Sequence, residues 1–202
     1  TNTGYDDFLL LYATDLIGNF DIKFVFNKDK SVFSDSIPVK FLNSAHNDLY
    51  PSFNKDQSEI YFCSDRQNGK YDIYHADIDI AYGEMSVVLS DTSYKIVTRD
   101  TVLSSAYDDK CPYIFGNTLV FTSNRPGGFG GFDLYFSIFE NGQWTKPTNF
   151  GSQINSEYDE YRPILFEEEV DNDKNMMVFS SNRSGGKGGF DLYFVGVENQ
   201  IE

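Results

Sequence analysis

One phrase recurs four times along the chain and restricts what it can fold into. The two clearest copies span 120–136 and 178–194 and share Val-Phe, a Ser-Asn-Arg turn, a glycine-rich stretch and Phe-Asp-Leu-Tyr-Phe. A shortened copy lies at 60–74 and a degenerate one at 11–22. Each copy contains an aromatic-Asp-aliphatic step, and these steps are 51, 61 and 58 residues apart, at Asp21, Asp72, Asp133 and Asp191. A recurrence at this period indicates a repeat architecture.

Each phrase predicts a strand, a tight turn and a second strand. In the third copy the large apolar residues Phe132, Leu134 and Phe136 alternate with Asp133 and Tyr135, as in a strand with two unlike faces. Glycine makes a compact reversal accessible between the strands because it adopts positive φ without steric cost. No helical periodicity of useful length is present, so we expect an all-β protein.

A second element precedes each of the last three phrases. It is an acidic, Tyr-containing loop that ends in Pro, at 43–51, 104–112 and 155–163. A short apolar run follows each Pro, and a further strand follows the phrase. One unit is therefore about four short antiparallel strands, which is the size of a propeller blade.

This ordered set of motifs resembles the WD-like β-propeller repeats of the TolB type, found in bacterial envelope proteins often beside OmpA-like domains. The resemblance covers about residues 9–198 and implies a small β-propeller, most simply of four blades. We expect a single domain over 1–202 with units at about 1–42, 43–103, 104–154 and 155–202. The first unit departs from the pattern because Leu16 replaces the Arg, and the second has an irregular last-strand region at 86–103.

The two ends of the chain raise a question of closure. The first unit lacks an inner strand and the last lacks an outer one. One hypothesis is that residues 1–8 add to the fourth blade and seal a ring. The alternative is an open arc that needs a partner or further sequence, since unpaired sheet edges promote aggregation.

The arginines of the turns are candidates for structural clamps. An Arg side chain can bind a carboxylate through two parallel hydrogen bonds and so fix a hairpin. We expect each Arg to pair with the Asp of the strand that follows it, in the pairs Arg66–Asp72, Arg125–Asp133 and Arg183–Asp191.

The acidic loops are the best candidate for a binding site. In a propeller the innermost strands line the central channel, so the loops before them gather at one mouth. The candidate residues there are Asn47, Asp48, Tyr107, Asp108, Asp109, Tyr158, Asp159 and Glu160. Converging carboxylates would favour calcium or a Lys- or Arg-bearing partner. The alternative is that these side chains cap turns through local backbone hydrogen bonds.

Other sites find little support in the sequence. The glycine-rich turns precede strands, whereas a phosphate loop requires a helix N-terminus. The acidic insertion at 167–175 lacks the Gly of an EF-hand loop and is expected to be a solvated turn. His46 and His75 have no catalytic or metal-ligand partner at a known spacing, so no metal site is expected. Cys63 and Cys111 occupy different repeat positions and are expected to be buried free thiols.

Composition narrows the classes of partner. A net charge of −15 argues against nucleic acid and against anionic membrane surfaces. Phe, Tyr and Trp make up 17% of the chain, and most of these rings are expected between stacked sheets. No apolar run is long enough for a membrane span. The resemblance implies export to the periplasm or outer membrane.

Together these observations predict a non-catalytic binding module with an acidic, aromatic-rich face for a protein or cell-wall partner. The alternative is a propeller that binds or cleaves carbohydrate, with Tyr and Trp as stacking platforms.

Overall fold

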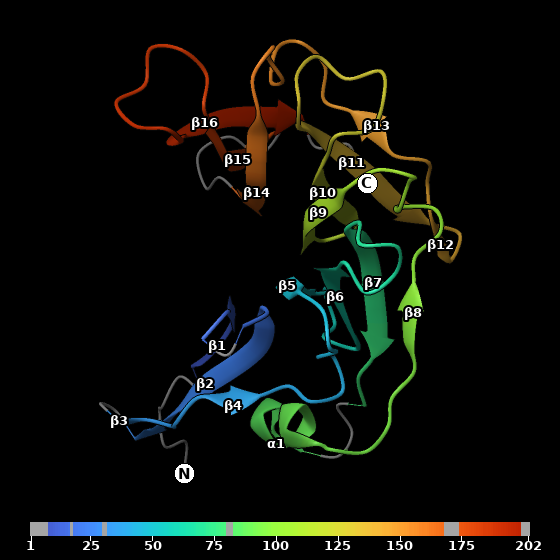
Figure 1. The fold of residues 1–202 in the computed structure, drawn as a ribbon, viewed down its shortest axis with the longest axis vertical. Helices are drawn as coiled ribbons and strands as arrows, with labels where there is room; N and C mark the ends of the chain where they lie inside the picture. The colour runs from blue at the N-terminus through green and yellow to red at the C-terminus, as the bar shows by residue number, and fades with distance from the viewer. Residues whose placement is uncertain (1–7, 17, 30–31, 80–82, 168–173, 199–202) are drawn as a thin grey trace.

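The computed structural model describes residues 8–16, 18–29, 32–79, 83–167 and 174–198. It contains four small antiparallel sheets, arranged as the four blades of a β-propeller, which Figure 1 shows fanned about a common centre. The predicted all-β, four-bladed fold is therefore confirmed. No helix in these ranges is long and apolar enough to cross a membrane.

Each sheet, called a blade from here on, falls within one sequence repeat. Blade 1 holds β1 (Leu9–Thr14), β2 (Asp21–Asp29), β3 (Val32–Phe33) and β4 (Ile37–Pro38). Blade 2 holds β5 (Asp48–Phe53), β6 (Glu59–Ser64), β7 (Asp72–Asp77) and β8 (Val97–Arg99). Blade 3 holds β9 (Asp109–Phe115), β10 (Thr118–Ser123), β11 (Asp133–Glu140), β12 (Gln143–Trp144) and β13 (Thr148–Asn149). Blade 4 holds β14 (Glu160–Glu167), β15 (Lys174–Ser181) and β16 (Asp191–Glu198).

One short helix interrupts the all-strand pattern. Helix α1 (Met85–Ser90) lies between β7 and β8, in the region where an irregular strand was expected. Its buried residues Val88 and Leu89 join the core between blades 1 and 2. The sequence shows no helical periodicity here because six residues are too few to display a 3.6-residue period, and the fold remains all-β.

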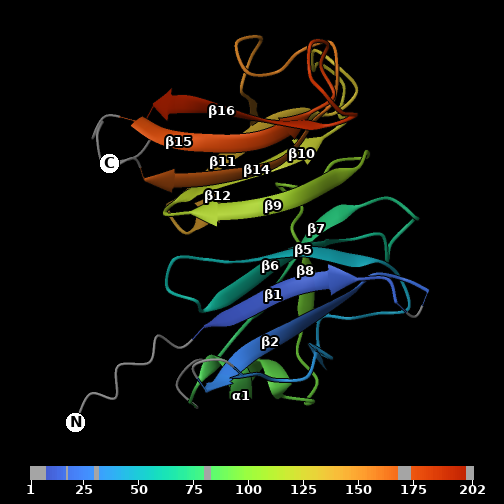
Figure 2. The ribbon, with the colours of Figure 1, turned by 90° about the vertical axis from the view of Figure 1, so that its left-hand side faces the viewer.

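The hydrophobic core lies between the blades. One apolar cluster joins blades 1 and 2, a second joins blades 2 and 3, and a third joins blades 3 and 4. Figure 2 shows the sheets stacked in this order. The aromatic residues contribute to all three clusters, as the composition predicts, with Phe24, Phe62 and Phe121 fully buried. Cys63 and Cys111 are buried free thiols, as predicted.

The outward face of blade 4 is uncovered by the described residues. Leu192 of β16 is 77% exposed, whereas Leu134, at the same repeat position in β11, is 0% exposed because blade 4 packs on it. Phe194 is 74% exposed on the same face. The predicted sealing strand at residues 1–8 lies outside the described residues except for Phe8, as does most of the acidic insertion at 167–175.

Candidate functional site

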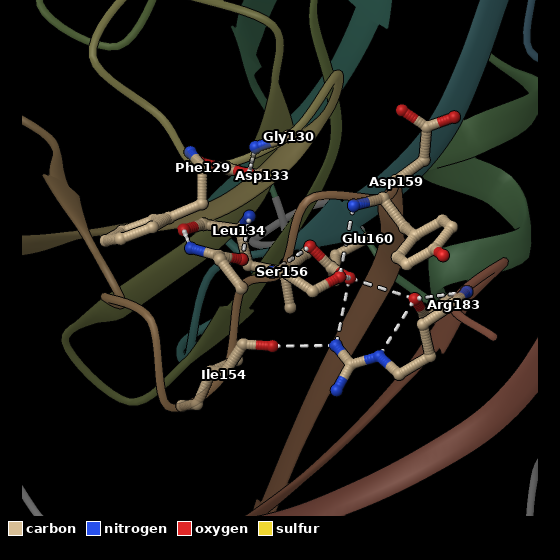
Figure 3. Close-up of polar contacts among 12 residues, drawn as sticks. Phe129, Gly130, Asp133, Leu134, Ile154, Ser156, Asp159, Glu160 and Arg183 are labelled. Carbon is tan, nitrogen blue, oxygen red and sulfur yellow. Dashed lines mark hydrogen bonds and ion pairs between the residues drawn. The ribbon is translucent and has the colours of Figure 1, made fainter. Parts of the chain in front are cut away.

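The predicted arginine clamps exist, but their partners differ from the prediction. Arg66, Arg125 and Arg183 pair with carboxylates of the acidic loops, at Nη2–O distances of 2.6, 2.6 and 2.9 Å, and not with the Asp of the following strand. The partners are Asp48, Asp109 and Glu160, whose side chains are 0% exposed. Figure 3 shows the pair in blade 4, where Arg183 also donates to the Ile154 carbonyl.

The direction of the Arg side chain explains this exchange of partners. Arg125 Nε donates to Ser123 Oγ at 3.0 Å, and its guanidinium lies over the rings of Phe121 and Tyr135. These contacts turn the side chain back across its own sheet toward the innermost strand. Arg66 and Arg183 make the same contacts with Ser64 and Ser181.

The Asp residues predicted as clamp partners hold other groups. Asp72 pairs with Arg99 at 2.7 Å. Asp133 accepts the backbone N–H of Phe129 and Gly130 within the glycine-rich turn, and Asp191 accepts the N–H of Gly188. A carboxylate at the start of the third strand therefore fixes the turn beside it in blades 3 and 4.

A second set of loop residues connects each blade to the one before it. Asn47, Asp108 and Asp159 each accept a backbone N–H from the preceding blade, at 3.1, 3.0 and 2.9 Å. The residue that follows each of them, Asp48, Asp109 or Glu160, donates its own backbone N–H to the preceding blade. The acceptor is the carbonyl of the same residue whose N–H was bound, at 2.8, 2.7 and 2.7 Å. The residues of the preceding blades that receive this two-point attachment are Phe20, Tyr71 and Phe132.

The acidic loops therefore hold the blades together. Of the eight candidates for the mouth of the channel, six have engaged polar side chains: three in these joints between blades and three in the Arg clamps within a blade. Tyr107, 41% exposed, and the partly buried Tyr158 do not. Three of the carboxylates carry an Arg partner and are unavailable to a cation; calcium binding by the remaining residues stays a prediction.

The sequence analysis missed a cluster at the centre of the molecule. Tyr50, Cys111 and Arg162 each precede a Pro and adopt positive φ, at 55°, 55° and 53°. The strand register shifts at each of them, so each inner strand carries a β-bulge. The recurring Pro marked these positions as unusual, since Pro disfavours the right-handed helical region for the residue before it, but it did not predict their positive φ.

The bulges bring side chains from different blades together. Arg162 donates from Nη2 to the Tyr50 hydroxyl at 3.1 Å, between blades 4 and 2. Burial raises the pKa of the Cys111 thiol to about 12, although the nearby Arg162 and the Tyr50 hydroxyl act in the opposite direction. Left-handed backbone in residues other than Gly costs about 1–3 kcal/mol each and is enriched at functional sites.

Two adjoining hollows of about 540 and 570 Å³ lie at this centre and share Tyr50, Tyr161 and Arg162. The first is also lined by Tyr71 and Lys110. Lys110 Nζ lies 4.3 Å from the centroid of the Tyr71 ring, and burial raises the pKa of Tyr71 to about 12. Together these residues form a surface of aromatic rings with two cationic groups, which we call the axial hollow.

The axial hollow has few groups for acid–base chemistry. Asp159 is the one carboxylate among the described lining residues of the two cavities, and it already binds the Phe132 N–H. Hydrolysis of glycosides generally needs two opposed carboxylates. His46 and His75 do not line either cavity.

Known proteins were compared by sequence and by structure. No family model matches the chain, and no curated protein is significantly similar to it. Among solved structures, TolB from Acinetobacter baumannii superposes with a TM-score of 0.52 at 21% identity, over 96% of this chain and 42% of that one. A putative TolB from Agrobacterium tumefaciens gives 0.54 at 13% identity, over 96% and 64%.

The same fold also occurs in a structure that is not a TolB protein. Bacteroides ovatus Xyloglucan PUL GH43B superposes with a TM-score of 0.54 at 13% identity, over 95% of this chain and 38% of that one. The chain thus spans less than two thirds of the length of these structures, and identities this low establish the fold alone. The likeness expected from the repeat motifs is confirmed at that level: the chain has the β-propeller fold seen in the TolB structures.

Proposed function

We propose that the chain is a non-catalytic binding propeller of the bacterial envelope that holds a protein partner at its axial hollow. The observation that carries this proposal is the convergence of the bulge residues Tyr50 and Arg162 with Tyr161, Tyr71 and Lys110 on one hollowed surface. Tyr and Arg are the residue types that most often dominate protein–protein binding energy.

The charges of the hollow indicate the chemistry of the partner. The acidic residues expected at the mouth are engaged in the blade joints and the Arg clamps, whereas Lys110 and Arg162 line the hollow itself. Arg162 lies over the ring of Tyr50, with 5.5 Å between Cζ and the ring centroid. The segment that fits is therefore a peptide with a carboxylate and an apolar or aromatic residue, and not the cationic partner that the net charge alone favours.

The side chains of the axial hollow are held by neighbouring aromatic rings. The Tyr161 ring packs between Phe132 and Phe190, with centroid distances of 4.7 and 5.8 Å. Lys110 Nζ is held between the rings of Tyr71 and Phe132. A rigid surface loses little conformational entropy on binding, which favours affinity.

A displayed library of random peptides, selected on the wild-type chain, tests this proposal. Selected peptides are expected to carry an acidic group and to lose about tenfold or more in affinity with Arg162→Met and Tyr161→Ala. Truncating a Tyr or Arg that dominates binding costs about 2 kcal/mol or more, and every 1.4 kcal/mol is a factor of about ten in affinity. Tyr94→Ala is the matched control because Tyr94 is 91% exposed and lies outside the hollow.

Other outcomes would contradict the proposal. Selected peptides that bind Arg162→Met and Tyr161→Ala as tightly as the wild type would place binding elsewhere. Binding to a glycan array that Tyr161→Ala abolishes and Arg162→Met spares would favour carbohydrate. Turnover of chromogenic glycosides or aminoacyl anilides by the wild type would show an enzyme. The envelope location is tested by fractionating cells that express the full-length gene.

A further inference from the structure

Blade 2 departs from the repeat pattern at three positions on one face. The position three residues after the repeated Asp is Phe24, Phe136 and Phe194 in blades 1, 3 and 4, but His75 in blade 2. The position two residues further along the strand is Asp77 in blade 2, and in blades 1, 3 and 4 it is Phe26, Ile138 and Gly196. The residue paired with this second position on the neighbouring strand is Glu59 in blade 2. In blades 1, 3 and 4 it is Leu9, Thr118 and Met176. Blade 2 alone places three ionisable groups on this face.

The three groups lie close enough to share a ligand. Glu59 pairs with Asp77 across the strands, and His75 precedes Asp77 by two residues on the same face. Each offers one ligand atom, and these atoms all lie within 4.8 Å of one another. Glu59 Oε1 is 3.4 Å from His75 Nδ1. Two ligands bound to Zn²⁺ at about 2.0–2.1 Å in tetrahedral geometry are themselves separated by roughly 3.4 Å.

The imidazole of His75 is fixed in place with one nitrogen unsatisfied. Its ring stacks on Tyr61 at a centroid distance of 5.3 Å and an interplanar angle of 18°. The Tyr61 hydroxyl in turn accepts a hydrogen bond from Trp144 Nε1 of blade 3, at 3.1 Å. Nδ1 is buried and has no hydrogen-bond partner among the described residues, an arrangement that is rare in native proteins.

The Glu59 carboxylate is held so that one oxygen faces the histidine. Asn54 Nδ2 donates to Oε2 at 3.2 Å, while Asn54 Oδ1 accepts the Glu59 backbone N–H at 3.0 Å. Oε1 lies 3.4 Å from His75 Nδ1, and the carboxylate also interacts with the Tyr61 hydroxyl, which fixes it beside the imidazole. Supporting hydrogen bonds of this kind orient the ligands of protein metal sites.

We propose that Glu59, His75 and Asp77 bind a Zn²⁺ ion on blade 2, with the fourth coordination position open to water or to a ligand. One imidazole and two carboxylates suit Zn²⁺, and three protein ligands with an open position are typical of its reactive sites. Glu59 also lines a hollow of about 450 Å³ between blades 2 and 3, together with Asn54 and Trp144, which gives the ion a path from solvent.

Zinc titration of the chelator-treated chain tests the proposal. Calorimetry is expected to show one Zn²⁺ bound per chain, and Co²⁺ to give the visible absorption of a four-coordinate site. His75→Gln and Asp77→Asn should each weaken Zn²⁺ binding about tenfold or more, the scale on which even the supporting residues of a metal site act. His46→Gln is the matched control, because His46 is the other histidine and lies beside Asp65, away from this site.

A third variant separates loss of the site from loss of the fold. His75→Phe restores the residue found in the other three blades and should fold normally while it abolishes Zn²⁺ binding. If His75→Gln and His75→Phe bind Zn²⁺ as the wild type does, the ion binds elsewhere. If the wild type binds no Zn²⁺ at millimolar concentration, Glu59 and His75 form a simple ion pair. Either result overturns the proposal, and neither depends on peptide binding at the axial hollow.

Discussion

Removal of Arg125 should destabilise the protein more than its place at the surface of a turn would indicate. Its partner Asp109 is 0% exposed, and the Arg125 Nη2–Asp109 Oδ1 distance is 2.6 Å. In Arg125→Met the carboxylate keeps the Ser105 N–H but loses its counter-charge. Leaving one member of a buried ion pair alone costs about 3–5 kcal/mol, and the 16% exposure of Arg125 indicates the lower end of that range.

This cost can be measured through the single tryptophan. Trp144 is 8% exposed and donates to the Tyr61 hydroxyl of blade 2, so its fluorescence reports the junction between blades 2 and 3. Urea unfolding followed by this signal and by circular dichroism should show a clearly lower midpoint for Arg125→Met. A loss of about 3 kcal/mol is a large share of the roughly 5–15 kcal/mol that stabilises a typical domain.

A double-mutant cycle isolates the ion pair. In Arg125→Met with Asp109→Asn the buried charge is absent, so the combined loss should be smaller than the sum of the two single losses. Lys95→Met is the matched control, because the Lys95–Asp91 pair at 3.1 Å is partly exposed and its loss should leave the midpoint unchanged. An unchanged midpoint in Arg125→Met, or additive losses in the cycle, would refute the reasoning.

Three further predictions follow from differences between repeats. Gly130→Ala should lower the free energy of unfolding by about 1–3 kcal/mol, because a Cβ there would overlap the carbonyl oxygens of Tyr158 and Ser156. Gly188→Ala should lie within about 0.5 kcal/mol of wild type, because its Cβ would make only one contact, at 3.7 Å. Thermal melting measures both. In urea unfolding, Leu134→Ala should lower the free energy of unfolding by about 2–5 kcal/mol and the exposed Leu192→Ala by almost nothing. A comparable loss at Leu192 would mean that the outer face of blade 4 is covered in solution, and sedimentation would detect the covering chain. Burial raises the pKa of the Cys111 thiol to about 12, so the thiol should not react with a thiol reagent at pH 8 until the chain unfolds. The stability that the neutral thiol contributes should be complete below about pH 8.5, the pKa of an exposed thiol. It should decline as the pH rises from there toward 12.

The sequence by itself determined the repeat, the strands and the turns. These follow from local properties that each unit carries, such as the alternation of Phe132, Leu134 and Phe136 along a strand. The glycine of the turn at Gly127, with φ of +92°, is another such local property. Because every blade is built from the same local pattern, recurrence predicted four similar units, and the size of the unit together with the resemblance to TolB-type repeats predicted a propeller.

Only the tertiary structure decided which groups meet. Arg125 turns toward Asp109 and not Asp133 because Ser123 and two rings direct its side chain, and this direction has no counterpart in sequence spacing. Likewise, Glu59 and His75 are 16 residues apart in the sequence and become neighbours only through the pairing of β6 with β7. Charges and ligands act over a few ångströms in space, so their partners depend on how the strands and blades pack and not on distance along the chain.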